Sequence, residues 1–163
     1  MSKISPLAFI DPEAKIGENC EIGPFCFIDK NVEIGDNNVL MNSVSVLYGA
    51  RIGNGNVIFP GAVISAVPQD LKFQGEDTTA EVGDNNKIRE NVTINRGTAA
   101  KGKTCVGSGN LLMESVHVAH DAFVGNDCII GNGTKLAGEI IIDDHAIILS
   151  LIHISEPTRH SLI

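Results

Sequence analysis

A six-residue repeat runs through most of the chain and constrains its fold more than any other feature. Starting at Ile4 and stepping by six, 22 of the 25 positions up to Ile148 hold Ile, Leu or Val, against about seven expected by chance from the composition. The exceptions are Asp70, Glu76 and Ala100, and the phase resumes after each of them. The chain is therefore predicted to repeat one short structural unit.

The residues around each repeated position identify this unit as a short β-strand followed by a corner. Two positions before the aliphatic residue there is often a smaller side chain, such as Cys20, Ala62 or Ala122. Inward side chains two residues apart are typical of a strand, whereas a helix needs apolar residues three and four apart. The repeat therefore predicts an all-β chain.

A second period shows how these units are arranged. Five glycines are separated by multiples of 18 residues, namely Gly17, Gly35, Gly53, Gly107 and Gly125. Three units then make one coil, and the chain is predicted to form a triangular parallel β-helix of about eight coils, three sides per coil. Glycine in a column fits a corner where the backbone needs positive φ or close approach.

The repeat also sets the domain boundaries. Residues 1–148 are predicted to form the β-helix domain. Residues 149–163 are predicted to be a non-native tail outside the repeat, because this segment has no glycine and loses the six-residue phase. Two excursions interrupt the stack, near residues 65–81 and 98–103. Loops carried by a rigid scaffold are the usual place for binding residues.

Composition excludes several classes of function. The formal net charge of −8 disfavours nucleic acid as a partner. The longest uncharged run, residues 52–69, is rich in Gly, Pro and Asn, so no stable membrane insertion is expected. The N-terminus lacks the apolar core of a signal peptide, and four cysteines without C-x-x-C spacing indicate reduced thiols. We expect a cytoplasmic protein.

The candidate catalytic residues lie in the run from residue 111 to residue 121. The strand period predicts that His117 faces outward and that His120 projects from a corner, directly followed by Asp121. One coil of 18 residues further, Gly138 should lie about 5 Å from His120 along the stack. A general base beside a free backbone N–H is the minimum set for acyl transfer. A solvated surface pair of His and Asp is the alternative.

The same 18-residue step places Lys103 one coil below Asp121, where its charge would favour the ionised carboxylate.

A prism with three flat faces also exposes surfaces that cyclic packing would cover, so a homotrimer is expected. His117 and His120 would then line a cleft between subunits.

The repeat resembles the hexapeptide pattern of a large acyltransferase superfamily over residues 4–148, which implies a left-handed β-helix. Closer motifs resemble the UDP-N-acetylglucosamine O-acyltransferases of lipid A biosynthesis. These motifs are Ile22–Cys26, Gln69–Lys72, Ile88–Thr98, Gly107–Met113, His117–Asp121 and Leu136–Gly138.

This resemblance implies a cytoplasmic homotrimer that moves a 3-hydroxyacyl chain from acyl carrier protein to the glucosamine 3-hydroxyl of UDP-GlcNAc, the first step of lipid A biosynthesis. Carried over by motif, His120 is the general base and Asp121 orients it. The Gly138 N–H stabilises the oxyanion. No metal and no organic cofactor is implied.

Other residues follow from the resemblance or depart from it. Asp70 and Lys72 are implied to contact the sugar nucleotide, and His117 to line the substrate cleft. Glu139 stands where the family often has a substrate-binding His, and Asn95 replaces another His. Glu139 should also lie one coil from the carboxylate of the catalytic pair, which is expected to raise the pKa of at least one of the two.

The family continues with further coils and a C-terminal helical domain that this sequence lacks, so weak carrier-protein binding, with poor turnover or none, is expected of the chain. Three alternatives stay open: a sister acyltransferase that forms N-acyl or acetyl products, a zinc lyase resembling γ-type carbonic anhydrases, and a non-catalytic structural trimer. The lyase would need three histidines to converge across a subunit boundary, and His145 is the only other histidine in the repeat.

Overall fold

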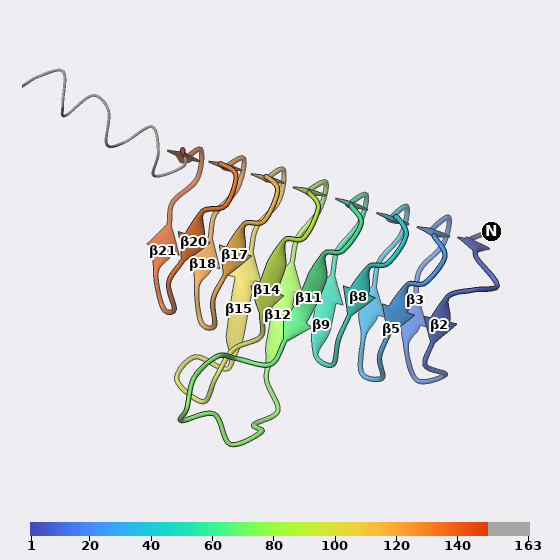
Figure 1. Ribbon diagram of the computed structural model, residues 1–163, viewed down its shortest axis with the longest axis horizontal. Coiled ribbons are helices and arrows are strands. Elements are labelled where there is room, and N and C mark those ends of the chain that lie inside the picture. The colour runs from blue at the N-terminus through green and yellow to red at the C-terminus, as the bar shows by residue number, and fades with distance from the viewer. Residues whose placement is uncertain (150–163) are drawn as a thin grey trace, which may run out of the picture.

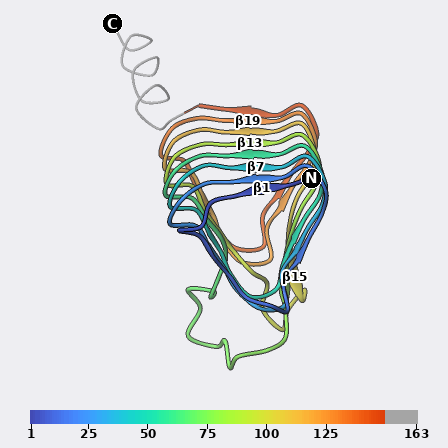
Figure 2. The same cartoon turned by 90° about the vertical axis from the view of Figure 1, so that its right-hand side faces the viewer.

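The computed structural model describes residues 1–149, which form a left-handed parallel β-helix of triangular cross-section (Figures 1 and 2). This part of the chain contains no α-helix, and none that could span a membrane. The predicted all-β class and the three sides per coil are confirmed. Of the predicted tail, residues 150–163 lie outside the described residues.

Each side of the triangle is one parallel sheet, and successive strands of a sheet come from successive coils. The first face contains β1 (Lys3–Ile4), β4 (Glu21–Ile22), β7 (Val39–Leu40), β10 (Val57–Ile58), β13 (Lys87–Ile88), β16 (Leu111–Leu112), β19 (Ile129–Ile130) and β22 (Ile147–Ile148). The second face contains β2 (Phe9–Ile10), β5 (Phe27–Ile28), β8 (Ser45–Val46), β11 (Val63–Ala66), β14 (Thr93–Asn95), β17 (His117–Val118) and β20 (Lys135–Leu136). The third face contains β3 (Lys15–Ile16), β6 (Glu33–Ile34), β9 (Ala50–Ile52), β12 (Thr79–Val82), β15 (Lys103–Val106), β18 (Phe123–Val124) and β21 (Ile141–Ile142).

The register explains why the six-residue phase survives the two excursions. Paired residues are normally 18 apart, as in Lys3↔Glu21. Across the coil with the first excursion they are 30 apart, as in Val57↔Lys87, and across the coil with the second they are 24 apart. The excursions therefore add two and one six-residue units, and they leave the stack as loops 67–78 and 96–102 at one corner of the prism (Figures 1 and 2).

The core is the aliphatic interior that the repeat predicts. The repeated Ile, Leu and Val side chains from Ile22 to Ile142 are buried, and the residues two positions earlier are buried with them up to Cys128. Ile4 in the first coil is 47% exposed because no coil covers it on one side. Burial of this aliphatic column is the main stabilising contribution to the fold.

The glycine column lies at the corner between the third and first faces, and it serves close approach rather than positive φ. A Cβ added to Gly35 would lie 2.7 Å from the carbonyl oxygen of Gly53 in the next coil. None of the column glycines has positive φ, which occurs two residues later, for example at Asn37. Gly83 also belongs to the column, although the first excursion moves it out of the 18-residue spacing.

A ladder of buried asparagines runs along the inside of the same corner. Its members take the inward position before the strands of the first face, and they are Asn38, Asn56, Asn86 and Asn110, each at most 1% exposed. The Asn86 Nδ2 donates to Asn56 Oδ1 at 3.0 Å and to the Gly107 carbonyl at 2.9 Å, while Asn86 Oδ1 accepts the Asn110 N–H at 2.9 Å. The side chains thus satisfy backbone groups that the turn leaves unpaired.

Asn86→Ala is expected to lower the free energy of unfolding by about 2–5 kcal/mol, because it leaves buried backbone groups without partners. Urea denaturation of the chain would measure this loss. Asn42→Ala is the matched control, since Asn42 is exposed and makes only a 3.5 Å side-chain contact. Equal stability of the two variants would contradict a stabilising role of the ladder.

Candidate active site

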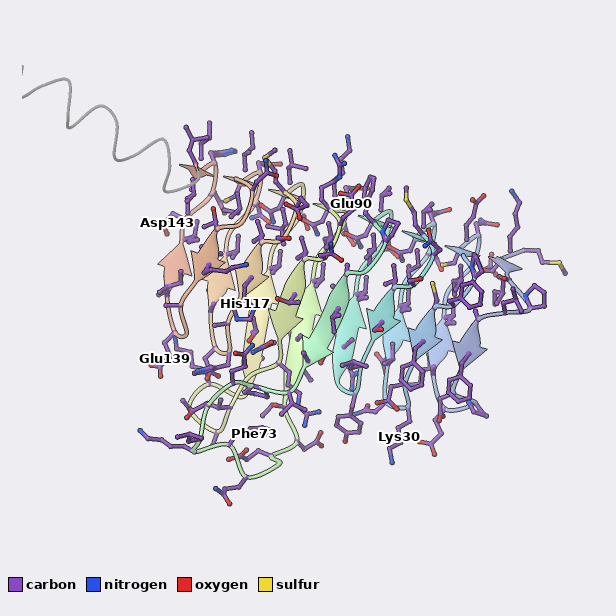
Figure 3. All side chains as sticks on the ribbon, in the orientation of Figure 1. Lys30, Phe73, Glu90, His117, Glu139 and Asp143 are labelled. Atoms are coloured by element: carbon purple, nitrogen blue, oxygen red, sulfur yellow. The ribbon has the colours of Figure 1, made fainter. Side chains whose placement is uncertain are left out.

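The corner between the second and third faces brings the predicted catalytic residues together. His120 and Asp121 form the turn after β17, and Gly138 and Glu139 form the equivalent turn one coil later, after β20. Loops 67–78 and 96–102 leave the stack at this corner, and Figure 3 shows Glu139 on the same side as these loops. All four turn residues therefore lie where the two excursions can reach them.

His120 contacts both of the partners that the sequence assigns to it. Its Nδ1 lies 2.9 Å from Asp121 Oδ2. Because a carboxylate can only accept, Nδ1 carries the proton and Nε2 is left with a free lone pair. A Cβ built on Gly138 would lie 2.9 Å from His120 Nε2 and 2.8 Å from Cε1, so only glycine leaves room for the imidazole against this backbone. The adjacent Glu139 N–H donates to the His120 carbonyl at 3.1 Å.

The Gly138 N–H donates to no acceptor within residues 1–149. The imidazole of His120 is 18% exposed, so Nε2 remains accessible to a substrate. A basic nitrogen and an unused N–H thus lie side by side at adjacent levels of the stack. This arrangement can remove a proton from a nucleophile and stabilise an oxyanion at one place.

Asp121 is buried, and both its carboxylate oxygens and its backbone N–H have hydrogen-bond partners. Thr98 in loop 96–102 donates its backbone N–H to Asp121 Oδ1 at 2.9 Å and its hydroxyl to Oδ2 at 2.6 Å, and the Asp121 N–H donates to Thr104 Oγ1 at 2.8 Å. Burial raises the pKa of the Asp121 carboxyl, but the hydrogen bonds from Thr98 and His120 outweigh burial and leave the pKa below its ordinary value. Asp121 is therefore held as a carboxylate.

The charges expected to act on this carboxylate do not do so. The register of β15 with β18 places Lys103 one coil below Asp121, as predicted, but the Lys103 ammonium pairs with Glu81 at 3.1 Å on the third face, because the Lys103 side chain points outward from β15. The neighbouring Glu139 does not raise the pKa of Asp121, which is shifted downward.

Loop 96–102 supplies site residues that the six-residue pattern did not reveal. Thr98 holds Asp121, and the Lys101 ammonium donates to the carbonyl oxygens of Asp121 at 3.3 Å and of Glu139 at 3.2 Å. Lys101 therefore links the two turns that carry the base and the N–H donor. The sequence signals for these residues are the excursion itself, which leaves the stack at the corner where His120 lies, and for Thr98 also the motif Ile88–Thr98.

Thr98→Val is expected to raise the pKa of Asp121 toward its ordinary value, because it removes the hydroxyl that donates to Oδ2. A carboxyl group whose pKa is lower in the folded chain than in the unfolded chain stabilises the fold at pH values above its pKa in the unfolded chain. This contribution is lost as the pH falls through its pKa in the folded chain. Wild-type chain should therefore lose more unfolding free energy than Thr98→Val between pH 5 and pH 2.5. Urea denaturation at several pH values measures this difference, and parallel pH profiles would contradict the role of Thr98.

The predicted sugar-binding residues form a second group beside the catalytic pair. Asp70 and Lys72 in loop 67–78 line a cavity of about 170 Å³ together with Thr98 and Glu139. Since Thr98 also bonds Asp121, the cavity and the catalytic pair share one wall. Glu139, the residue that departs from the family pattern, faces this cavity and brings a further carboxylate to it.

His117 contacts neither the His120–Asp121 pair nor the residues that line the cavity. It points outward from the second face, as predicted (Figure 3), and its Nδ1 lies 2.7 Å from the Thr93 hydroxyl. Burial and the nearby Lys135 ammonium lower the pKa of His117, so it is neutral near pH 7. Because His117 faces outward, it can line a substrate cleft only where another molecule covers the second face.

The remaining residues singled out in the sequence lie elsewhere. His145 occupies the corner between the third and first faces, where its Nδ1 lies 3.9 Å from Asp127 Oδ2. It does not converge with the other two histidines, and residues 1–149 of one chain contain no group of three His, Cys, Asp or Glu placed to hold a metal ion. Asn95 is buried at the end of β14, and its Nδ2 has no hydrogen-bond partner in this part of the chain.

Comparison with known proteins gives close matches among solved structures. The chain is similar to LpxA, a UDP-N-acetylglucosamine acyltransferase from Bacteroides fragilis 9343, with 73% identity and a TM-score of 0.88 over 90% of this chain and 57% of that one. It is also similar to a Francisella novicida UDP-N-acetylglucosamine acyltransferase, with 44% identity and a TM-score of 0.88 over 90% and 54% of the two chains. No family model matches. The chain thus spans a little over half the length of these two enzymes.

Proposed function

Because the chain belongs to the UDP-N-acetylglucosamine acyltransferase family, we propose that it transfers a 3-hydroxyacyl group from acyl carrier protein to the 3-hydroxyl of UDP-GlcNAc. This reaction would be the first step of lipid A biosynthesis. One observation carries the proposal: the imidazole of His120 lies against the backbone of Gly138, with the other ring nitrogen bound to a buried carboxylate.

The proposed mechanism uses this geometry directly. His120 Nε2 removes the proton of the sugar 3-hydroxyl, and the oxygen attacks the thioester carbonyl of the carrier-bound acyl chain. The carbonyl oxygen becomes an oxyanion that accepts a hydrogen bond from the Gly138 N–H. Asp121 stabilises the imidazolium that forms. When the C–S bond breaks, the imidazolium returns its proton to the leaving thiolate, which restores the neutral base.

The neighbouring cavity supplies the site for the acceptor in this proposal. The Lys72 ammonium suits a phosphate oxygen of the nucleotide, and the Asp70 and Glu139 carboxylates suit the hydroxyl and amide donors of the sugar. In a homotrimer, His117 would line the same cleft between subunits as His120, since it faces outward and lies three residues before the base. We place the reaction in the cytoplasm, where carrier protein and sugar nucleotide are available.

The test is an acyl-transfer assay with mass-spectrometric detection of the product. We expect the 163-residue chain to convert UDP-GlcNAc and 3-hydroxyacyl carrier protein into the 3-O-acyl product over long incubations. An N-acyl product from an amino-sugar acceptor, or an acetyl product from acetyl-CoA, would assign the site to a sister acyltransferase instead. No product from any of these pairs, with carrier protein and UDP-GlcNAc at saturating concentrations, would overturn the proposal.

A further inference from the structure

Loop 67–78 buries only Pro68 and Thr78, next to its two ends, although its middle carries two residues of the proposed sugar site. Leu71 is fully exposed. The Asp70 carboxylate accepts the Lys72 N–H at 2.9 Å and the Asp70 carbonyl accepts the Phe73 N–H at 3.0 Å, so these hydrogen bonds lie within the loop. Ordering such a segment costs conformational entropy, and contacts outside the loop must offset that cost.

The main contact at the middle of the loop is with Arg96. Its guanidinium carbon lies 5.2 Å from the centre of the Phe73 ring and 5.1 Å from the centre of the Tyr48 ring, within the range of cation–π attraction. Arg96 is 9% exposed, and none of the ion pairs within residues 1–149 includes it. Its Nε has no hydrogen-bond partner in the same residues, and its Nη1 donates to the Tyr48 carbonyl at 3.4 Å. Two aromatic rings and one carbonyl oxygen thus hold a buried cation.

Tyr48 extends this contact to both ends of the loop. Its hydroxyl donates to Asp77 Oδ1 at 3.0 Å, near the end of the loop. Its carbonyl accepts the Ser65 hydroxyl at 2.6 Å, just before the loop begins. We call Tyr48, Arg96 and Phe73 the aromatic clamp. The clamp therefore holds the loop at its start, its middle and its end.

The clamp lies next to the proposed sugar site without being part of the catalytic contacts. Phe73 follows Lys72 directly, and Figure 3 shows Phe73 in the loop on the side of Glu139. The contacts among His120, Asp121 and Gly138 pass through none of the three clamp side chains. Loosening the clamp should therefore move the cavity wall and leave the catalytic pair in place.

We propose that the aromatic clamp positions loop 67–78 for binding of the acceptor sugar nucleotide, which makes Arg96 and Phe73 positioning residues. The identity of the ligand rests on the proposed function. When the clamp is broken, the loop occupies its binding-competent position for a smaller fraction of the time, and the apparent affinity falls in proportion to that fraction. The chemical step at saturating substrate is unchanged.

Amide hydrogen exchange of the intact chain without substrate tests the positioning itself. Phe73→Leu keeps the apolar bulk and removes the ring, whereas Phe73→Tyr keeps the ring. Exchange across residues 67–78 should be about 10-fold faster in Phe73→Leu and unchanged in Phe73→Tyr. Arg89→Met is the matched control, because it removes a guanidinium 4.5 Å over Phe59 at another corner. Wild-type exchange in Phe73→Leu would overturn the proposal.

Steady-state kinetics test the link to the ligand. The KM for UDP-GlcNAc should rise about 10-fold in Phe73→Leu and in Arg96→Met, with kcat within about twofold of the wild-type value, and it should stay unchanged in Phe73→Tyr and Arg89→Met. A loss of kcat at unchanged KM would contradict a positioning role. If the wild-type chain neither binds nor acylates UDP-GlcNAc, the proposed function and the ligand assignment fail together, while hydrogen exchange still decides whether the clamp holds the loop.

Discussion

His120→Ala should lower the rate of acyl transfer by about 10³-fold and leave the β-helix intact. Removing a positioned general base typically costs a factor of about 10²–10⁴, and within residues 1–149 the His120 imidazole is the side chain that lies against Gly138. His120 lies at a corner and its side chain is not part of the aliphatic core. Transfer rates measured by mass spectrometry, with circular dichroism of both proteins, check the two halves of this prediction.

His145→Ala is the control for this experiment. His145 also projects from a corner and also lies near an aspartate, but it belongs to another edge of the prism and its side chain is 76% exposed. It should retain the wild-type transfer rate. Equal rates for His120→Ala and wild type would remove His120 from the mechanism.

The second large effect is expected for Gly138→Ala. The new methyl group would overlap the imidazole of His120, at 2.8 Å from Cε1 and 2.9 Å from Nε2, so the ring must rotate away from its position against the Gly138 backbone. The φ of Gly138 lies outside the left-handed region, so alanine causes no backbone strain there. We expect about a 10²-fold lower transfer rate, because the base and the oxyanion donor no longer act at one place.

A double variant isolates the cause of this loss. If Gly138→Ala acts by displacing the imidazole, then adding it to His120→Ala should lower the rate little further, because the two changes affect one interaction. Fully multiplicative losses in the double variant would show that the methyl group harms a different step.

The fold and the juxtaposition of His120 with Gly138 could be predicted from the sequence because one period controls both. Strand, corner and coil all follow from the spacing of six and eighteen residues, and this spacing is enough to place His120 beside Gly138. The prediction worked where the coils are regular. It also found the two excursions, because each adds whole six-residue units and so preserves the phase.

The same reasoning failed where the chain leaves the repeat. Counting back 18 residues from Asp121 gave Lys103, which does lie one coil below, but Thr98 from the excursion folds over the carboxylate and the Lys103 ammonium pairs with Glu81. No period describes the path of a loop, which depends on contacts such as the stacking of Arg96 on Phe73. The asparagine ladder was within reach of the sequence, since its members share the inward position, but two of its spacings are altered by the excursions.

The most direct test of the account is a crystal structure of the chain with UDP-GlcNAc bound. We expect the diphosphate near Lys72 and the sugar 3-hydroxyl about 3 Å from His120 Nε2, the distance at which a base can take the proton. The acyl carbonyl would then fit beside the Gly138 N–H. A sugar bound at another corner, or with its 3-hydroxyl turned away from the imidazole, would contradict the proposal that adjacent coils form the catalytic site.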